Sequence, residues 1–307
     1  MGDENRRISV ELTIHGAFNK IVNPTAVALE QGQIDTLSDV DKNIPVATTS
    51  RKNYLALIIA NEKYENWAPV SYASNDGKIF KEYCIKTLGI PEQQVKFINN
   101  ASNANMGGGL DWLVSEVEML KEIENPADKR IIVYYAGHGY PVREGNYTES
   151  YLIPVDCNNV TSGKYSYSLS NIYDRLGALG VGSLTFFLDA CFSGSDRSGA
   201  ALVEGQRGVA IAPKSGSLSG NTVVFSAVNK DQTAHPYRDK RHGMFTYYLL
   251  KAMQESEGEI AYGELSKTIE ANVVKTMIRD DKGLVQNPTT EASSAMKVDN
   301  KWEQLKF

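Results

Sequence analysis

The chain has few cysteines and no long apolar run. Three cysteines, Cys84, Cys157 and Cys191, occur in 307 residues, and a number so small and odd argues against a disulfide framework. No apolar run approaches the roughly 18 to 20 residues of a membrane helix, and the first residues are too polar for a signal peptide. We therefore expect a soluble protein without a membrane partner, either cytoplasmic or exported with its leader absent from this chain.

Basic charge and nucleotide-binding motifs are also lacking. The formal net charge is -5 and the charges are interspersed, which argues against a nucleic-acid partner. The first predicted strand runs into Ala60-Asn-Glu-Lys-Tyr64 rather than a Gly-x-Gly-x-x-Gly turn, which argues against a doubly wound nucleotide or flavin protein. No Cys/His spacing of the metal-binding kind is present. With 42% apolar residues, the chain can nevertheless bury a large core.

The first 50 residues differ in pattern from the rest. Apolar and polar residues alternate in 8–14 and in part of 26–34, which predicts a half-exposed hairpin or small β-appendage. Residues 39–50 are interpreted as an extended linker. We therefore predict a prodomain or docking segment in residues 1–50, with no chemistry of its own, and a main domain in residues 51–307.

From Tyr54 onward, short apolar runs alternate with segments of helical period. Strands are predicted at 54–60, 95–98, 130–136, 151–155, 184–188 and 222–228. Helices are predicted at about 76–88, around 113–120, around 172–179, at 245–253 and at 265–277, and the glycines at 107–109 are interpreted as a loop. Apolar strands separated by helices predict an α/β fold with an open, mostly parallel sheet covered by helices on both faces.

Two of these strands end in residues that carry chemistry. Asp189 and Cys191 follow one strand, and His138 stands between two glycines after another. Open α/β sheets bind ligands outside the carboxyl ends of their strands. A cysteine and a histidine at the same edge of one sheet make a candidate nucleophile and base.

The motifs Tyr-Tyr-Ala-Gly-His-Gly139 and, some fifty residues later, Leu-Asp-Ala-Cys-Phe-Ser-Gly194 carry a family resemblance. With Ala-Leu-Ile-Ile-Ala-Asn61 at the first strand and Tyr-Leu-Ile-Pro-Val-Asp156 between them, the chain resembles the caspase-like cysteine peptidases, in the metacaspase and bacterial orthocaspase branch. The resemblance covers roughly residues 54–274. It implies a caspase-like fold, a cysteine endopeptidase acting on protein or peptide substrates, and a monomer.

The residues fit that chemistry. A thiolate of Cys191 would attack a peptide carbonyl, and the imidazole of His138 would protonate the leaving amine and then activate water. The backbone N–H groups near Gly139 and of Cys191 are candidates for the oxyanion hole. The family's dyad has no obligatory third acid, so we expect none.

By resemblance, Asp76 and Asp189 fall where metacaspases place the acidic residues of the pocket for the side chain before the cut, called S1. Two carboxylates favour Arg or Lys there through charge-assisted hydrogen bonds. We therefore predict cleavage after Arg or Lys and not after Asp.

Some metacaspases need calcium, and the resemblance bears on this too. Asp156 matches one ligand of the family's site and Asp196 is a candidate third, but Ser170-Asn171 stand where an acidic pair would be. Without that pair a hard divalent ion loses much of its oxygen cage, so we expect no cofactor.

Residues 196–221 are predicted to form a long loop rich in Gly and Ser. The loop contains Arg197, Arg207 and Lys214, which are possible autocleavage sites for a peptidase of basic specificity, and such loops are favoured sites of nicking. The enzyme would then be made as a zymogen. The alternative is a loop that is not cut.

Each candidate also has a purely structural interpretation. Cys191 could be a buried core residue, His138 could be structural, Asp76 could cap a helix, and Asp189 could only bond backbone. His235 and His242 lie in a polar loop and are weaker candidates for the base. The rival function is a catalytically silent caspase-fold module that binds a protein partner.

Overall fold

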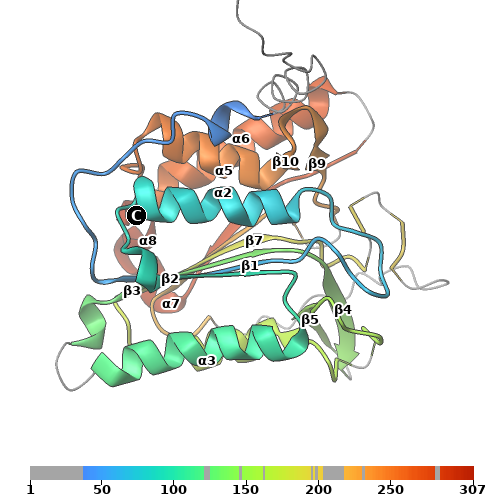
Figure 1. Ribbon diagram of the computed structural model, residues 1–307, viewed down its shortest axis with the longest axis horizontal. Helices are drawn as coiled ribbons and strands as arrows, with labels where there is room; N and C mark the ends of the chain where they lie inside the picture. The colour runs from blue at the N-terminus through green and yellow to red at the C-terminus, as the bar shows by residue number, and fades with distance from the viewer. Residues whose placement is uncertain are drawn as a thin grey trace, which may run out of the picture. The chain divides into compact units, whose positions relative to one another are not determined.

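A sheet with helices on both sides forms the centre of the unit Ser38–Phe307 (Figure 1). It has six strands in the order β11-β8-β7-β3-β1-β2. The computed structural model describes residues 37–307 except 121–124, 145–146, 162, 195, 198–199, 203–217, 230–231 and 281–283. The predicted β-appendage lies outside the described residues. The sheet strands are β1 (Tyr54–Ala60), β2 (Val95–Asn99), β3 (Arg130–Ala136), β7 (Ser183–Asp189), β8 (Thr222–Ser226) and β11 (Thr289–Ala292). The first five are parallel and only β11 runs antiparallel, so the mostly parallel sheet is confirmed.

The strands are apolar throughout because both faces of the sheet are covered. Every residue of β1 is buried, and its side chains alternate between two cores: Ala56 and Ile58 face one, Leu57 and Ile59 the other. Such continuous apolar runs are typical of sheets buried on both faces. Helices α2 (Ala73–Lys86), α5 (Met244–Glu255) and α6 (Tyr262–Arg279) contribute to the first core, and α3 (Asn103–Leu120) and α4 (Leu169–Gly177) to the second.

Two helix boundaries differ from the predicted ones. Helix α2 begins at Ala73, after Tyr72 in the left-handed region with φ of 71°, so Asp76 lies in the first turn and is not the N-cap. The glycines predicted to form a loop, Gly107 to Gly109, lie inside α3. A Cβ at Gly109 would stand 2.8 Å from Cδ1 of Ile98; the bare backbone therefore lets α3 approach the sheet closely.

A second, smaller sheet lies beyond the carboxyl end of β3. Strands β4 (Gly139–Glu144), β5 (Tyr147–Leu152) and β6 (Tyr167–Ser168) pair antiparallel. The strand predicted at 151–155 therefore ends at Leu152, before Pro154, because proline cannot donate to a ladder. Two short strands, β9 (Pro236–Tyr237) and β10 (His242–Gly243), form a separate pair.

The remaining elements are short. They are α7 (Ser294–Lys297), α8 (Lys301–Gln304) and the 3₁₀ turns η1 (Asp39–Asp41), η2 (Glu92–Gln94), η3 (Pro126–Asp128), η4 (Arg238–Lys240) and η5 (Val298–Asn300). Turn η1 belongs to the segment expected to be linker, yet Val40 is fully buried in the core and its carbonyl accepts the hydroxyl of Tyr83 at 2.9 Å. The compact unit that contains the sheet begins at Ser38. None of the helices in the described ranges is long and apolar enough to cross a membrane.

Candidate active site

Strands β3 and β7 place His138 and Cys191 at the same edge of the sheet. The two strands pair in parallel, with Ala136 opposite Asp189, so His138 and Cys191 each stand two residues beyond this last pair. The loops that carry them touch, since a Cβ at Gly139 would lie 2.6 Å from the carbonyl oxygen of Cys191. Gly139 is therefore required for this close approach, which holds the histidine loop against the cysteine loop.

His138 is fixed by backbone and by a tyrosine. Its Nε2 lies 2.7 Å from the carbonyl oxygen of Ala68, and because a carbonyl only accepts, Nε2 must carry the proton. Nδ1 then keeps its lone pair and can act as a base. The backbone N–H of His138 donates to the hydroxyl of Tyr64 at 2.8 Å, and the two rings lie 4.6 Å apart. Burial lowers the pKa of His138 to about 4, so the ring is neutral at physiological pH.

Cys191 is held by a different segment. The backbone N–H of Ala234 donates to its Sγ at 2.9 Å, and the side chain is buried. Burial raises the pKa of the Cys191 thiol to about 12 in spite of this hydrogen bond, so the group is a thiol at neutral pH. Among the hydrogen bonds of the described residues none joins Cys191 to His138. The structure thus holds a neutral thiol and a neutral imidazole on two loops that touch each other.

Asp76 and Asp189 lie close together, and both are fully buried. Asp189 accepts the hydroxyl of Thr246 at 2.6 Å, and Asp76 accepts the backbone N–H of Gly243 at 3.0 Å. Gly243 must be glycine here, because a Cβ would overlap a carboxylate oxygen of Asp189. Burial raises the pKa of Asp76 to about 6, against the lowering effect of His242 and Arg197. The carboxylates predicted for a pocket therefore do come together.

Arg197 occupies the space between these carboxylates. Its Nη2 lies 3.0 Å from Oδ1 of Asp189, and its Nη1 lies 3.8 Å from Oδ2 of Asp76. Nη1 also donates to the carbonyl oxygen of Ser71 at 2.8 Å. The side chain is only 6% exposed, so Arg197 is buried in an acidic pocket rather than displayed on a surface loop. The other two predicted autocleavage residues, Arg207 and Lys214, lie outside the described residues.

His242 joins the pocket to the segment around η1. Its Nδ1 lies 2.7 Å from Asp76 and its Nε2 lies 2.8 Å from Asp41. Although burial would lower the pKa of His242, the hydrogen bonds with Asp41 and Asp76 raise it to about 9. The ring is therefore a cation with both nitrogens engaged, which leaves no lone pair for a base. The backbone N–H of His235, the other weak candidate, donates to Gln286 at 2.9 Å.

The two candidates for calcium ligands, Asp156 and Asp196, have hydrogen-bond partners within the chain. Asp156 accepts the backbone N–H of Asn103, the first residue of α3, at 2.8 Å, which is the role of a helix cap. Asp196 accepts the N–H of Ala200 at 3.0 Å. Within the part of the chain that the structure describes, no three or more His, Cys, Asp or Glu side chains are grouped so that they could hold a metal ion.

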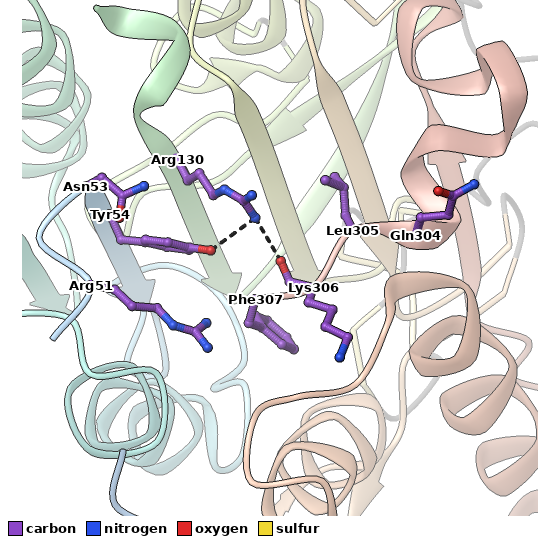
Figure 2. A pocket seen from close by; sticks show the side chains of 8 residues that line it. All are labelled: Arg51, Asn53, Tyr54, Arg130, Gln304, Leu305, Lys306 and Phe307. Atoms are coloured by element: carbon purple, nitrogen blue, oxygen red, sulfur yellow. Dashed lines mark hydrogen bonds between the residues drawn. The ribbon is translucent and has the colours of Figure 1, made fainter. Parts of the chain in front are cut away.

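A separate pocket lies at the opposite, amino end of the sheet, where β1 and β3 begin. Figure 2 shows Arg130 pointing at both the hydroxyl of Tyr54 and the carbonyl of Lys306, at 3.2 and 3.1 Å. Arg51, which also lines this pocket, forms an ion pair with Glu259 at 2.9 Å. None of its lining residues belongs to the cysteine and histidine loops, so the two sites are distinct.

Residues 53–298 match the family model of the caspase domain. The chain belongs to the caspase-domain family of cysteine peptidases. The match spans both strand ends described above. No curated protein sequence matches the chain.

Solved structures share the caspase-like fold at low identity. Protein GSU0716 from Geobacter sulfurreducens is 15% identical, with a TM-score of 0.54, and the match covers 83% of this chain and 97% of that one. Caspase-1 from Spodoptera frugiperda is 14% identical, with a TM-score of 0.54, and the match covers 82% of this chain and 91% of that one. At this identity the likeness concerns the fold alone.

Sequence reasoning missed the residues that reach the site from a distance. Tyr64, Ala68 and Ala234 contact His138 or Cys191 from loops. Ala68 and Ala234 do so through backbone atoms, and a contact of that kind cannot be recognised from the type of residue. Thr246 stands in the first turn of α5, where its side chain meets Asp189. The pair His242-Gly243 before α5 was the available signal, because a glycine just before a helix can mark a close approach.

Proposed function

We propose that the chain is a cysteine endopeptidase that cleaves after Arg or Lys, with Cys191 as nucleophile and His138 as general base and acid. The observation that carries the proposal is the joint placement of the thiol, the imidazole and two buried carboxylates at one sheet edge. Membership of the caspase-domain family supports the reaction class. We further propose that the chain belongs to the metacaspase and orthocaspase branch, which its motifs resemble and on which the proposed basic specificity rests.

The reaction would proceed in two steps. The Cys191 proton moves to Nδ1 of His138, the nitrogen left free by the bond from Nε2 to Ala68, and the thiolate sulfur forms a bond to the substrate carbonyl carbon. The C–N bond then breaks as His138 returns the proton to the leaving amine. In the second step His138 takes a proton from water, the resulting hydroxide attacks the thioester carbon, and the C–S bond breaks. The departing Cys191 thiolate then takes the proton back from His138, which restores the neutral pair. We assign the oxyanion hole to the N–H groups of Gly139 and Cys191.

Specificity for a basic side chain would come from Asp76 and Asp189. A guanidinium between two carboxylates makes charge-assisted hydrogen bonds, and a low-dielectric pocket strengthens them. The pocket already holds a guanidinium, that of Arg197, which supports the match between the pocket and this chemical group.

Processing of the chain by its own activity is part of the proposal. Arg207 and Lys214 are the sites we expect to be cut, because Arg197 is buried and a buried bond is poorly accessible. The intact mass of active wild type should fall during incubation, while that of Cys191→Ala should not. A constant mass in active protein would contradict processing but not peptidase activity.

The test of the function is hydrolysis of fluorogenic peptides that end in Arg, Lys or Asp, by wild type and Cys191→Ala, with calcium or with a chelator. Release after Arg or Lys that disappears in the variant is the expected result. Release after Asp would overturn the specificity and retain the cysteine and histidine. No release by folded, processed protein would favour the rival function, a caspase-fold module that binds a protein partner.

A further inference from the structure

We propose that Arg197 is a built-in occupant of the acidic pocket, which keeps the peptidase closed until this side chain is withdrawn. The proposal rests on the proposed function, since it takes the pocket of Asp76 and Asp189 as the site for the substrate's basic side chain. It adds a regulatory element from the chain itself. The same guanidinium group that a substrate would offer is supplied internally, six positions after the nucleophile.

The contacts of Arg197 are those expected for a bound substrate side chain. One nitrogen faces each carboxylate, and Nη1 also donates to the carbonyl oxygen of Ser71. The Arg197 side chain is only 6% exposed, and both carboxylates are fully buried. A second cation therefore cannot enter the pocket without displacing the first, because two buried like charges in contact repel each other strongly.

The fit is nevertheless incomplete. Nη2 and Nε of Arg197 and Oδ1 of Asp189 are buried but lack an aligned hydrogen-bond partner, although Nη2 and Oδ1 are only 3.0 Å apart. A buried donor without a partner costs free energy. A substrate Arg that approached from outside could align with the carboxylates and recover this loss. Arg197 is thus held firmly enough to fill the pocket, and loosely enough to be replaced.

The nucleophile is in a closed state in the same structure. The Cys191 thiol is bound by the N–H of Ala234 and not by His138, and its pKa is raised to about 12 by burial. Arg197 lies on the loop that Cys191 begins. Withdrawal of the arginine would therefore shift the chain next to the thiol and open the pocket together with the nucleophile.

The alternative role for Arg197 is to bind an acidic side chain of the substrate directly. Two buried carboxylates already face this guanidinium, and they would repel a third. The charges around Arg197 therefore favour its role as an occupant of the acidic pocket over the binding of an acidic substrate. The experiment separates the two roles because they predict opposite effects of removing the arginine.

The first measurement compares hydrolysis of Arg- and Asp-ending peptides by wild type, Arg197→Ala, Arg197→Gln and the control Arg175→Ala. Arg175 is an exposed arginine on α4, which is not part of the acidic pocket, and it pairs with Asp111 of α3. We expect kcat/KM for the Arg peptide to rise about tenfold or more in both Arg197 variants, because a larger fraction of molecules is competent to bind, and not in the control. An unchanged or lower rate on the Arg peptide, or loss of cleavage after Asp, would overturn the proposal.

The second measurement does not need activity. In a Cys191→Ala background, the melting temperature is followed as agmatine, a small guanidinium compound, is added. Agmatine should stabilise the chain that also carries Arg197→Ala and should have little effect where Arg197 is present. This result would stand even if no peptide were cut, so failure of the proposed function is distinguishable. Equal stabilisation of both chains, or of neither, in folded protein would contradict the proposal.

Discussion

The proposed catalytic pair, Cys191 and His138, and the acidic pocket lie at one sheet edge but are held in opposite ways. Cys191 and His138 are neutral, do not bond to each other, and are fixed by backbone groups of Ala234 and Ala68. Asp76 and Asp189 instead face cations and side-chain donors, among them Arg197 and His242. The difference teaches that burial keeps Cys191 and His138 uncharged, whereas the two carboxylates of the pocket are balanced by buried cations.

The largest effect is expected at the catalytic pair. His138→Ala should lower kcat by about 10²- to 10⁴-fold, because proton transfer by a positioned side chain contributes that much. The loss should not be accompanied by a change in the preference for Arg over Asp peptides. A variant that keeps more than about a tenth of the wild-type rate would contradict the role of His138 as base.

The pocket should respond to charge removal with a loss of stability. Asp189→Asn leaves the buried Arg197 without its closest carboxylate, and breaking a buried pair in this way costs about 3 to 5 kcal/mol. The matched control is Asp111→Asn, which breaks the exposed pair with Arg175 and should cost under about 1 kcal/mol. Urea unfolding of the two variants measures both values. Similar losses in the two would show that Arg197 is not held by Asp189.

Stability should also depend on pH through His242. Its pKa is raised from 6.5 to about 9 in the folded chain, so the native state binds the proton more tightly than the unfolded state. The contribution is fully present below pH 6.5 and is lost as pH rises through 9, on the order of 3 kcal/mol. The pKa of Asp76 is raised to about 6, so this group changes the stability at pH values below the range of His242.

Urea unfolding at pH values from 6.5 to 9 tests this expectation. The free energy of unfolding of wild type should fall across the range, and that of His242→Gln should be lower at the start and nearly constant. An equal slope in wild type and variant would assign the pH dependence to other groups.

The smallest expected effects are those of adding a methyl group at two glycines, Gly243 in the tightly packed pocket and Gly108 on an open side of α3. Gly243→Ala places a Cβ against Asp189 and within 3.0 Å of a nitrogen of Arg197, and overpacking of this kind costs about 1 to 3 kcal/mol. Gly108→Ala, inside α3 with no atom within 4 Å of the new Cβ, should instead stabilise by about 0.5 to 1 kcal/mol. Thermal unfolding gives both signs. Destabilisation by both changes would remove the contrast between the positions.

Local sequence patterns predicted the strands and the positions of His138 and Cys191, because each of these two residues follows directly after an apolar strand. The strand predicted at 54–60 has those bounds in the structure, and the two strand ends follow from the parallel register. The position of Arg197 was not predictable, since Ser71 and Asp76 are more than one hundred residues away in sequence. The ion pairs of His242 were not predictable for the same reason: its partners Asp41 and Asp76 meet it only after folding.

The shared register of β3 and β7 has a consequence for how this molecule tolerates change. Neighbouring strands lie about 4.8 Å apart, so the spacing of His138 and Cys191 is set by the ladder between Ala136 and Asp189 and not by loop length. A change in the length of a connecting loop should therefore leave the spacing of His138 and Cys191 unchanged. The sheet is thus a rigid support for Cys191 and His138, and the loops at its edge can vary in sequence and length without moving these two residues apart.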